Sequence, residues 1–327
     1  CSSMRFNPKA RLERGRVSDS GGRGGRGGRG GGMSGGGMRI PIPGGTKAGG
    51  GLAGLVIIIL FIVLTQCLGG GTGGTGGSPF PDDSLDTSRV DGGNSGRYAS
   101  CQTGADANED EDCARVAVEN SLFDFWSDNL ESQSGVSFTP EEELATFSGA
   151  VDTGCGQATS QVGPFYCPAD RGIYLDTTFF EDVLQGQLGG PAGEFVEPYV
   201  LAHEYGHHIQ NLTGAMGQVR TQQGPLSDAV RLELQADCYA GMWARAATST
   251  EDASGVPLIS DISDQDMAEA VAAAKSVGDD RIQQQTTGRV NPEGWTHGSA
   301  EQRQRWFLTG YEEGSMDACD TFSASQL

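Results

Sequence analysis

The sequence predicts an α+β fold, in which a mainly helical domain with one small sheet lies behind a single transmembrane helix. Three observations predict it. Helical patterns recur along residues 98–327, β-rich runs are concentrated in residues 151–177, and one apolar run lies in Gly-rich surroundings before them. No internal repeat is present, so the helical part is predicted to be one domain.

Residues 1–47 are predicted to form a disordered basic tail. Gly-Gly-Arg units repeat through residues 21–32, and such a segment buries too little apolar surface to offset the entropy of ordering. The tail carries ten Lys/Arg against two acidic residues, a net of +8. Beside a membrane segment we interpret it as a topology signal, with contact to RNA or anionic lipid as the alternative.

The residues from Ser78 onward are strongly acidic. They carry 12 Lys/Arg against 41 Asp/Glu, a net of −29, which gives the whole chain its net charge of −21. An acidic domain repels a polyanion, so nucleic acid is excluded as the expected partner of the folded part.

Residues 48–68 are predicted to be an uncleaved transmembrane anchor. The apolar run of residues 52–64 reaches roughly 18–20 residues with its Gly and Ala neighbours, about the length that spans a bilayer. A signal peptide is the alternative, but the segment before the run is too long and no small-x-small cleavage site follows. The positive-inside rule places the tail in the cytoplasm and the domain outside it. Residues 69–97 are predicted to be a flexible linker.

Six cysteines of the domain predict three disulfides, as expected of an exported protein. Sequence leaves 15 pairings open, and reduced buried thiols are the alternative. Pairing of nearest neighbours is the simplest hypothesis, which joins Cys101 to Cys113, Cys155 to Cys167 and Cys238 to Cys319.

The helices and strands of the domain follow in order from local signals. A first helix is predicted over residues 113–130, and Pro168 begins a turn between two β-rich runs that form a hairpin. Gly214 ends one later helix, and Pro225 precedes the next. The remaining helices are predicted over residues 178–187, 194–212, 226–247, 263–277 and 299–313.

His203 and His207 are candidate metal ligands. One helical turn is 3.6 residues, so both imidazoles project from one face of a helix and can share one tetrahedral zinc ion. Glu204 follows His203 and is placed to act as general base towards water rather than to bind the metal. The alternative is that the two histidines are ordinary surface or core residues.

Glu233 is predicted to complete the ligand set from the following helix. A catalytic zinc needs a third protein ligand. A third histidine at the metzincin spacing is absent, because Gln210 and Thr213 stand where that pattern requires Gly and His. Asp237 lies one turn after Glu233 and could hold the outer nitrogen of a ligand histidine. The alternative is a solvated acidic helix face.

Three further residues are candidates either for a donor to a developing oxyanion or for a structural role. His297 lies in a loop before a helix, where a catalytic and a capping role are equally plausible. Tyr205 faces away from the ligand side and is interpreted as structural. His208 is about 100° away from the ligand register and is interpreted as a core residue or as an outer neighbour of the ligands. Residues 172–176 could bind a peptide by β-addition or could be a core strand.

The combination of these motifs resembles the putative neutral zinc metallopeptidase family of single-pass bacterial membrane proteins, with the gluzincin pattern of ligands. The resemblance covers nearly the whole chain and rests on Met4 and on residues 40–42, 163–168, 203–207, 233–237 and 296–303. It implies a zincin-like fold, one zinc per chain held by His203, His207 and Glu233, and Glu204 as the base.

The predicted function is therefore that of a membrane-anchored, extracytoplasmic zinc metallopeptidase that hydrolyses peptide bonds, with a protein or peptide as its substrate. The alternatives are a catalytically silent, zinc-stabilised binding domain at the cell surface and a zinc amidase acting on the cell wall. The carboxylate of Glu204 favours an active hydrolase, because a silent domain has no need of it.

Overall fold

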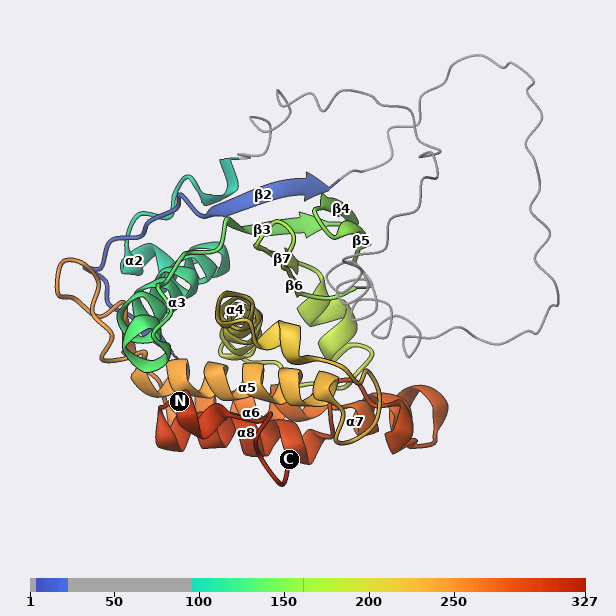
Figure 1. Ribbon diagram of the computed structural model, residues 1–327. Helices are drawn as coiled ribbons and strands as arrows, with labels where there is room; N and C mark the ends of the chain where they lie inside the picture. Colours follow the sequence, from blue (N-terminus) through green and yellow to red (C-terminus); the bar gives the residue numbers. More distant parts are fainter. Residues whose placement is uncertain (1–3, 23–95, 161) are drawn as a thin grey trace, which may run out of the picture.

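The computed structural model describes residues 4–22, 96–160 and 162–327, which form a mixed, mainly helical body with a small sheet (Figure 1). The helices are α2 (Gly104–Ala107), α3 (Glu111–Ser134), α4 (Val196–Thr213), α5 (Asp228–Ala246), α6 (Asp264–Ser276), α7 (Asp279–Thr287) and α8 (Ala300–Glu313). The strands are β1 (Arg5–Phe6), β2 (Val17–Gly22), β3 (Glu143–Ser148), β4 (Ala150–Thr153), β5 (Gly156–Thr159), β6 (Phe165–Cys167), β7 (Gly172–Asp176) and β8 (Ile259–Asp261).

The main sheet has four strands in the order β2-β3-β7-β6. β2, β3 and β7 run parallel, and β6 pairs antiparallel with β7, so that Tyr166 lies opposite Ile173. The predicted hairpin before and after Pro168 is thereby confirmed. It leaves β7 paired on both sides and β6 at the edge of the sheet.

Helix α4 lies between the sheet and a lower layer of helices. Figure 1 shows α4 end-on, with the sheet above it, α5, α6 and α8 below it, and α3 at its side. The helices predicted around residues 113–130, 194–212, 226–247, 263–277 and 299–313 are confirmed as α3, α4, α5, α6 and α8. Residues 179–185 instead form a short π-helical segment.

The ends of these helices follow their capping residues. Ser227, Ser263 and Ser299 each accept a hydrogen bond from the backbone three residues later, at the starts of α5, α6 and α8. Gly214 ends α4 with a φ of 77°, which an L side chain rarely adopts. The register of each helix is therefore set locally by its own sequence.

Two glycines bring the helices unusually close together. A Cβ on Gly206 of α4 would lie 3.1 Å from the Cα and the carbonyl oxygen of Ala236 in α5. A Cβ on Gly310 of α8 would overlap the carbonyl of Cys238 in α5. Helix α5 is consequently held tightly between α4 and α8, which fixes what its side chains can reach.

Three disulfides join the pairs predicted from nearest neighbours. Cys101 bonds to Cys113, Cys155 to Cys167 and Cys238 to Cys319. The first two close loops of 12 residues, whereas the third ties the C-terminal segment to the middle of α5 across 81 residues. The last bond therefore fixes a segment that otherwise lies on the surface of the helical layer.

The prediction of a disordered tail is wrong for residues 4–22. Met4, Phe6, Ala10, Leu12 and Val17 are buried in the main core. β1 pairs with β8, and β2 forms the outer strand beside β3.

Side chains of α2 and α3 fix the same segment to the domain. Asn120 bonds both the amide and the carbonyl of Glu13, Asn108 does the same for Phe6, and Arg16 pairs with Glu119 at 2.6 Å. The Gly/Arg-rich composition is confined to residues 21–32, and the residues before it carry apolar side chains that reach the core.

The predicted anchor, residues 48–68, and all but the last two residues of the predicted linker, 69–97, lie outside the described residues. Within the described ranges, no helix is both long and apolar enough to cross a membrane. Residues that pack in one body lie on one side of any membrane. The packing of residues 4–22 on the domain therefore conflicts with a single crossing that separates the tail from it.

The N-terminal segment should contribute directly to the stability of the domain. Phe6→Ala removes a side chain that is 3% exposed and should lower the free energy of unfolding by about 3–5 kcal/mol. Denaturant unfolding measures this, with Lys9→Ala at an exposed position as the control. Equal stability of the two variants would mean that the segment does not pack on the domain.

Candidate metal centre

The close crossing of α4 and α5 brings the two sequence motifs face to face. Gly206 lies between His203 and His207 and meets Ala236, which lies between Glu233 and Asp237. Each motif thus places its metal-binding groups within one turn of the contact point. A Cβ at position 206 would require the backbone of one helix to shift by a few tenths of an ångström.

His203, His207 and Glu233 form a compact group of potential ligands. Nε2 of His203 lies 3.3 Å from Oε2 of Glu233, and Nε2 of His207 lies 3.5 Å from Oε1 of the same carboxylate. One ligand atom from each residue lies within 4.8 Å of the others. Two imidazoles and a carboxylate are a common ligand set of a catalytic zinc, which leaves a fourth position open.

Hydrogen bonds on the far side of each ring orient the two histidines for a metal. Nδ1 of His203 lies 2.8 Å from Oδ1 of Asp237, and a carboxylate can only accept this bond. Nδ1 therefore carries a proton, and Nε2, which faces Glu233, is the nitrogen that a metal would bind in place of a proton. This arrangement is the one a zinc-binding histidine requires.

His207 is oriented in the same way by a buried amide. Nδ1 of His207 lies 2.8 Å from Oε1 of Gln210, whose Nε2 donates to the carbonyl oxygen of Leu232 at 2.7 Å. Because a carbonyl only accepts, the amide nitrogen of Gln210 must point to Leu232 and its oxygen to the ring. Both rings thus present Nε2 to Glu233, and the donor set fits zinc.

Asp237 is the centre of a buried polar network that the sequence only partly revealed. Besides His203, it accepts hydrogen bonds from the hydroxyl of Tyr199 at 2.6 Å and from two nitrogens of Arg303 at 2.7 and 2.8 Å. Asp237 was predicted from its spacing. Tyr199 and Arg303 were missed as partners, although Arg303 lies in one of the segments that carry the family resemblance.

The charges of this network shift several pKa values in the direction that favours a cation at the site. Burial alone would raise the pKa of Asp237, but Arg303 and His203 lower it to about 2. Burial alone would lower the pKa of His203, but Asp237 and Glu233 raise it to about 9. Despite its burial, Glu233 has a pKa far below its usual range because of His207, His297 and His203. The site is therefore built to hold positive charge.

Glu204 lies beside the ligand group on α4. It follows His203 directly, about 100° further around the helix, and is 7% exposed. This places it as a neighbour of the ligand cluster, outside the set of residues whose atoms converge.

His297 is held in the loop before α8. Its Nδ1 lies 2.8 Å from the hydroxyl of Thr296 and 3.6 Å from Oδ1 of Asp279, while Oδ2 of Asp279 accepts the amides of residues 296–298. Although burial lowers the pKa of His297, the carboxylates of Glu233 and Asp279 raise it above its usual value. The ring is thus within electrostatic reach of the ligand group.

Tyr205 and His208 lie away from the ligand group, as predicted. The ring of Tyr205 packs against that of His208, and burial followed by the carboxylate of Glu141 raises the pKa of Tyr205. His208 bonds the hydroxyl of Tyr166 and the carbonyl of Thr139, and burial lowers its pKa. Both residues belong to the core between α4 and its neighbours.

The suggestion that residues 172–176 bind a peptide by β-addition is wrong. These residues form β7, which is paired with β3 on one side and β6 on the other. Its backbone groups are therefore already used in the sheet, and the alternative of a core strand is confirmed.

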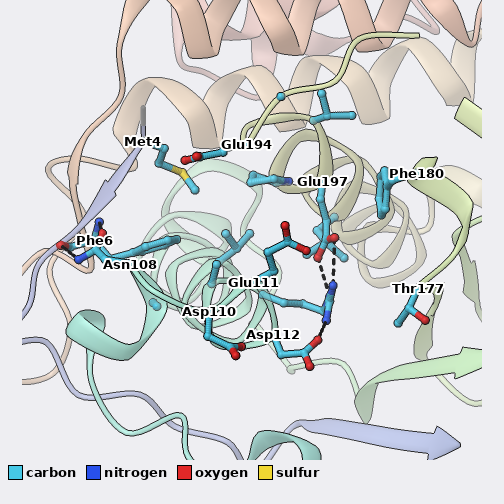
Figure 2. Close-up of a pocket in the computed structure, with 18 of the residues that line it drawn as sticks. Met4, Phe6, Asn108, Asp110, Glu111, Asp112, Thr177, Phe180, Glu194 and Glu197 are labelled. Carbon is cyan, nitrogen blue, oxygen red and sulfur yellow. Dashed lines mark hydrogen bonds and ion pairs between the residues drawn. The ribbon is translucent and has the colours of Figure 1, made fainter. Parts of the chain in front are cut away.

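A separate cavity of about 480 Å³ lies beside the first turns of α3 and α4 (Figure 2). At its wall, Arg115 pairs with Asp112 within α3 and with Glu197 of α4, and the second of these ion pairs joins the two helices. None of the six predicted site residues lines it. The cavity is therefore distinct from the metal centre.

The paired motifs and the ligand group they form are of the kind found in zinc metallopeptidases. The chain belongs to the putative neutral zinc metallopeptidase family, whose model matches residues 7–322. It is 53% identical to an uncharacterised protein of Mycobacterium tuberculosis over 229 residues, which are 69% of this chain and 76% of the relative. It is 40% identical to the uncharacterised protein YpfJ of Escherichia coli over 225 residues, 67% of this chain and 74% of that protein. No solved structure matches the chain.

The ligand assignment makes a direct prediction about zinc content. The folded wild-type chain should hold about one zinc, and His203→Ala should lose most of it because one of three protein ligands is removed. Elemental analysis of the purified proteins measures this, and His208→Ala removes a buried histidine outside the ligand group as a control. Full zinc retention in His203→Ala would contradict the assignment.

Proposed function

We propose that the protein is an extracytoplasmic zinc metallopeptidase of the gluzincin type, with a zincin-like fold. The observation that carries the proposal is the convergence of three ligand atoms from His203, His207 and Glu233, with both imidazoles oriented through their outer nitrogens. A histidine that binds a metal needs this orientation of its ring. The alternative of a solvated acidic helix face would not require it.

The residues around the ligands have distinct roles in this proposal. Zinc held by them supplies Lewis acidity and a nucleophilic water near neutral pH. Glu204 takes up the proton of the attacking water and delivers it to the leaving amine. His297, kept in place by Thr296 and Asp279, donates a hydrogen bond to the oxygen that becomes negative.

The three disulfides support a location outside the cytoplasm. Disulfides persist in oxidising compartments and are rare in reducing ones. We propose this location on the bonded cysteines, which join residues across the whole described domain. Contact with a membrane through residues 48–68 remains a prediction from the sequence.

Substitution of the base separates hydrolysis from metal binding. Glu204→Gln should keep about one zinc per chain but lower peptide hydrolysis by about 100-fold or more, because a general base of this kind contributes 10²–10⁴-fold. A fluorogenic peptide library measures turnover, with zinc content measured on the same samples.

The matched control is Glu131→Gln, a carboxylate exposed on α3 far along the sequence from either motif. It should retain both zinc and turnover. Unchanged hydrolysis in Glu204→Gln would exclude Glu204 as the base, and no hydrolysis of any peptide by the zinc-loaded wild type would contradict a peptidase function.

A further inference from the structure

The orientation of His207 depends on more than its direct partner. Gln210, which accepts the bond from the ring, is fully buried and donates through Nε2 both to Leu232 and to Oε1 of Gln235 at 3.1 Å. Gln235 in turn donates through its own Nε2 to the carbonyl oxygen of Cys319 at 3.1 Å. A continuous chain of hydrogen bonds therefore runs from the ligand ring to the C-terminal segment.

The direction of every bond in this chain is fixed by two backbone carbonyls, those of Leu232 and Cys319. The carbonyl of Cys319 can only accept, so the amide nitrogen of Gln235 must point to it, and the amide oxygen of Gln235 must point to Gln210. Gln210 then has its nitrogen towards Gln235 and its oxygen towards His207. The chain thus favours one tautomer of His207, the one with its Nε2 lone pair towards Glu233.

The far end of the chain is itself held firmly. Cys319 forms a disulfide with Cys238, which directly follows Asp237 on α5. Nearby, the hydroxyl of Thr321 donates to the carbonyl of Arg231 in the first turns of α5 at 2.6 Å. We call these contacts of residues 317–321 with α5 the C-terminal clasp.

We propose that Gln210 and Gln235 are positioning residues for His207, and that the C-terminal clasp sets the zinc affinity of the site through them. The inference rests on the proposed zinc site. The new element is a role in zinc binding for one disulfide and two side-chain amides, none of which bonds the metal.

The first test compares zinc affinities of folded variants. Gln210→Met removes the partner of His207 at similar volume and should weaken zinc binding by about 10-fold to 100-fold, the usual effect of losing an outer partner of a ligand. Gln235→Met should give a smaller loss. Competition with a chromophoric chelator measures the affinity, and circular dichroism confirms that each variant is folded.

The second test addresses the clasp. The double variant Cys238→Ala/Cys319→Ala should have a zinc affinity between those of the wild type and Gln210→Met. Adding Gln235→Met to this variant should cost less than it does alone, because both changes break the same chain. The control is Cys101→Ala/Cys113→Ala, which removes a disulfide that has no link to either histidine.

The outcomes separate this inference from the proposed function. Wild-type zinc affinity in the clasp variant, or fully additive losses with Gln235→Met, would overturn the inference even if the wild type cleaves peptides. Weakened zinc binding in the predicted order would support it even if no peptide is cleaved. Equal weakening in the control variant would also overturn it, since the effect would then reflect general stability.

Discussion

The contact between Gly206 and Ala236 is the constraint on which the rest of the site depends. Because the two backbones approach this closely, side chains from the facing sides of α4 and α5 can meet in a common centre. Across this contact, the carboxylate of Glu233 lies 3.3 Å and 3.5 Å from the two imidazoles. The contact also explains why the two motifs need their small residues at the central positions, since a Cβ at position 206 would meet backbone atoms that cannot move independently.

The second requirement is a balance of charge in a region without solvent. Asp237, Glu233, His203 and Arg303 are all at most 6% exposed, and an unpaired charge there would be very costly. Arg303 donates two hydrogen bonds to Asp237 and balances its negative charge. This carboxylate can therefore hold His203 without leaving an unpaired charge in the interior. The close packing of α5 on α8 at Gly310 is what lets the guanidinium of Arg303 reach it.

Much of this could be predicted from the sequence, because the signals involved are local. Helical spacing related His203 to His207 and Glu233 to Asp237, and Gly214 and Pro225 marked helix ends. The nearest-neighbour pairing of cysteines was also sufficient. Residues 4–22 could not be placed, since their partners Asn108, Asn120 and Glu119 lie about 100 residues away and no periodicity relates them. Gln210 lies one turn from His207 on α4, whereas Gln235 and Arg303 become neighbours of the site only through the packing of α5 and α8.

The buried amides show how the scaffold can control a metal without touching it. Carboxylate partners such as Asp237 orient a ring through charge, which is strong but requires a balancing Arg303. An amide such as Gln210 orients a ring through the direction of its dipole, and it needs no balancing charge, but its direction must be fixed from elsewhere. The carbonyl of Leu232 fixes it directly, and the carbonyl of Cys319 fixes it through Gln235. The two histidines are thus held by two different physical means, and only the second makes the C-terminal segment part of the metal centre.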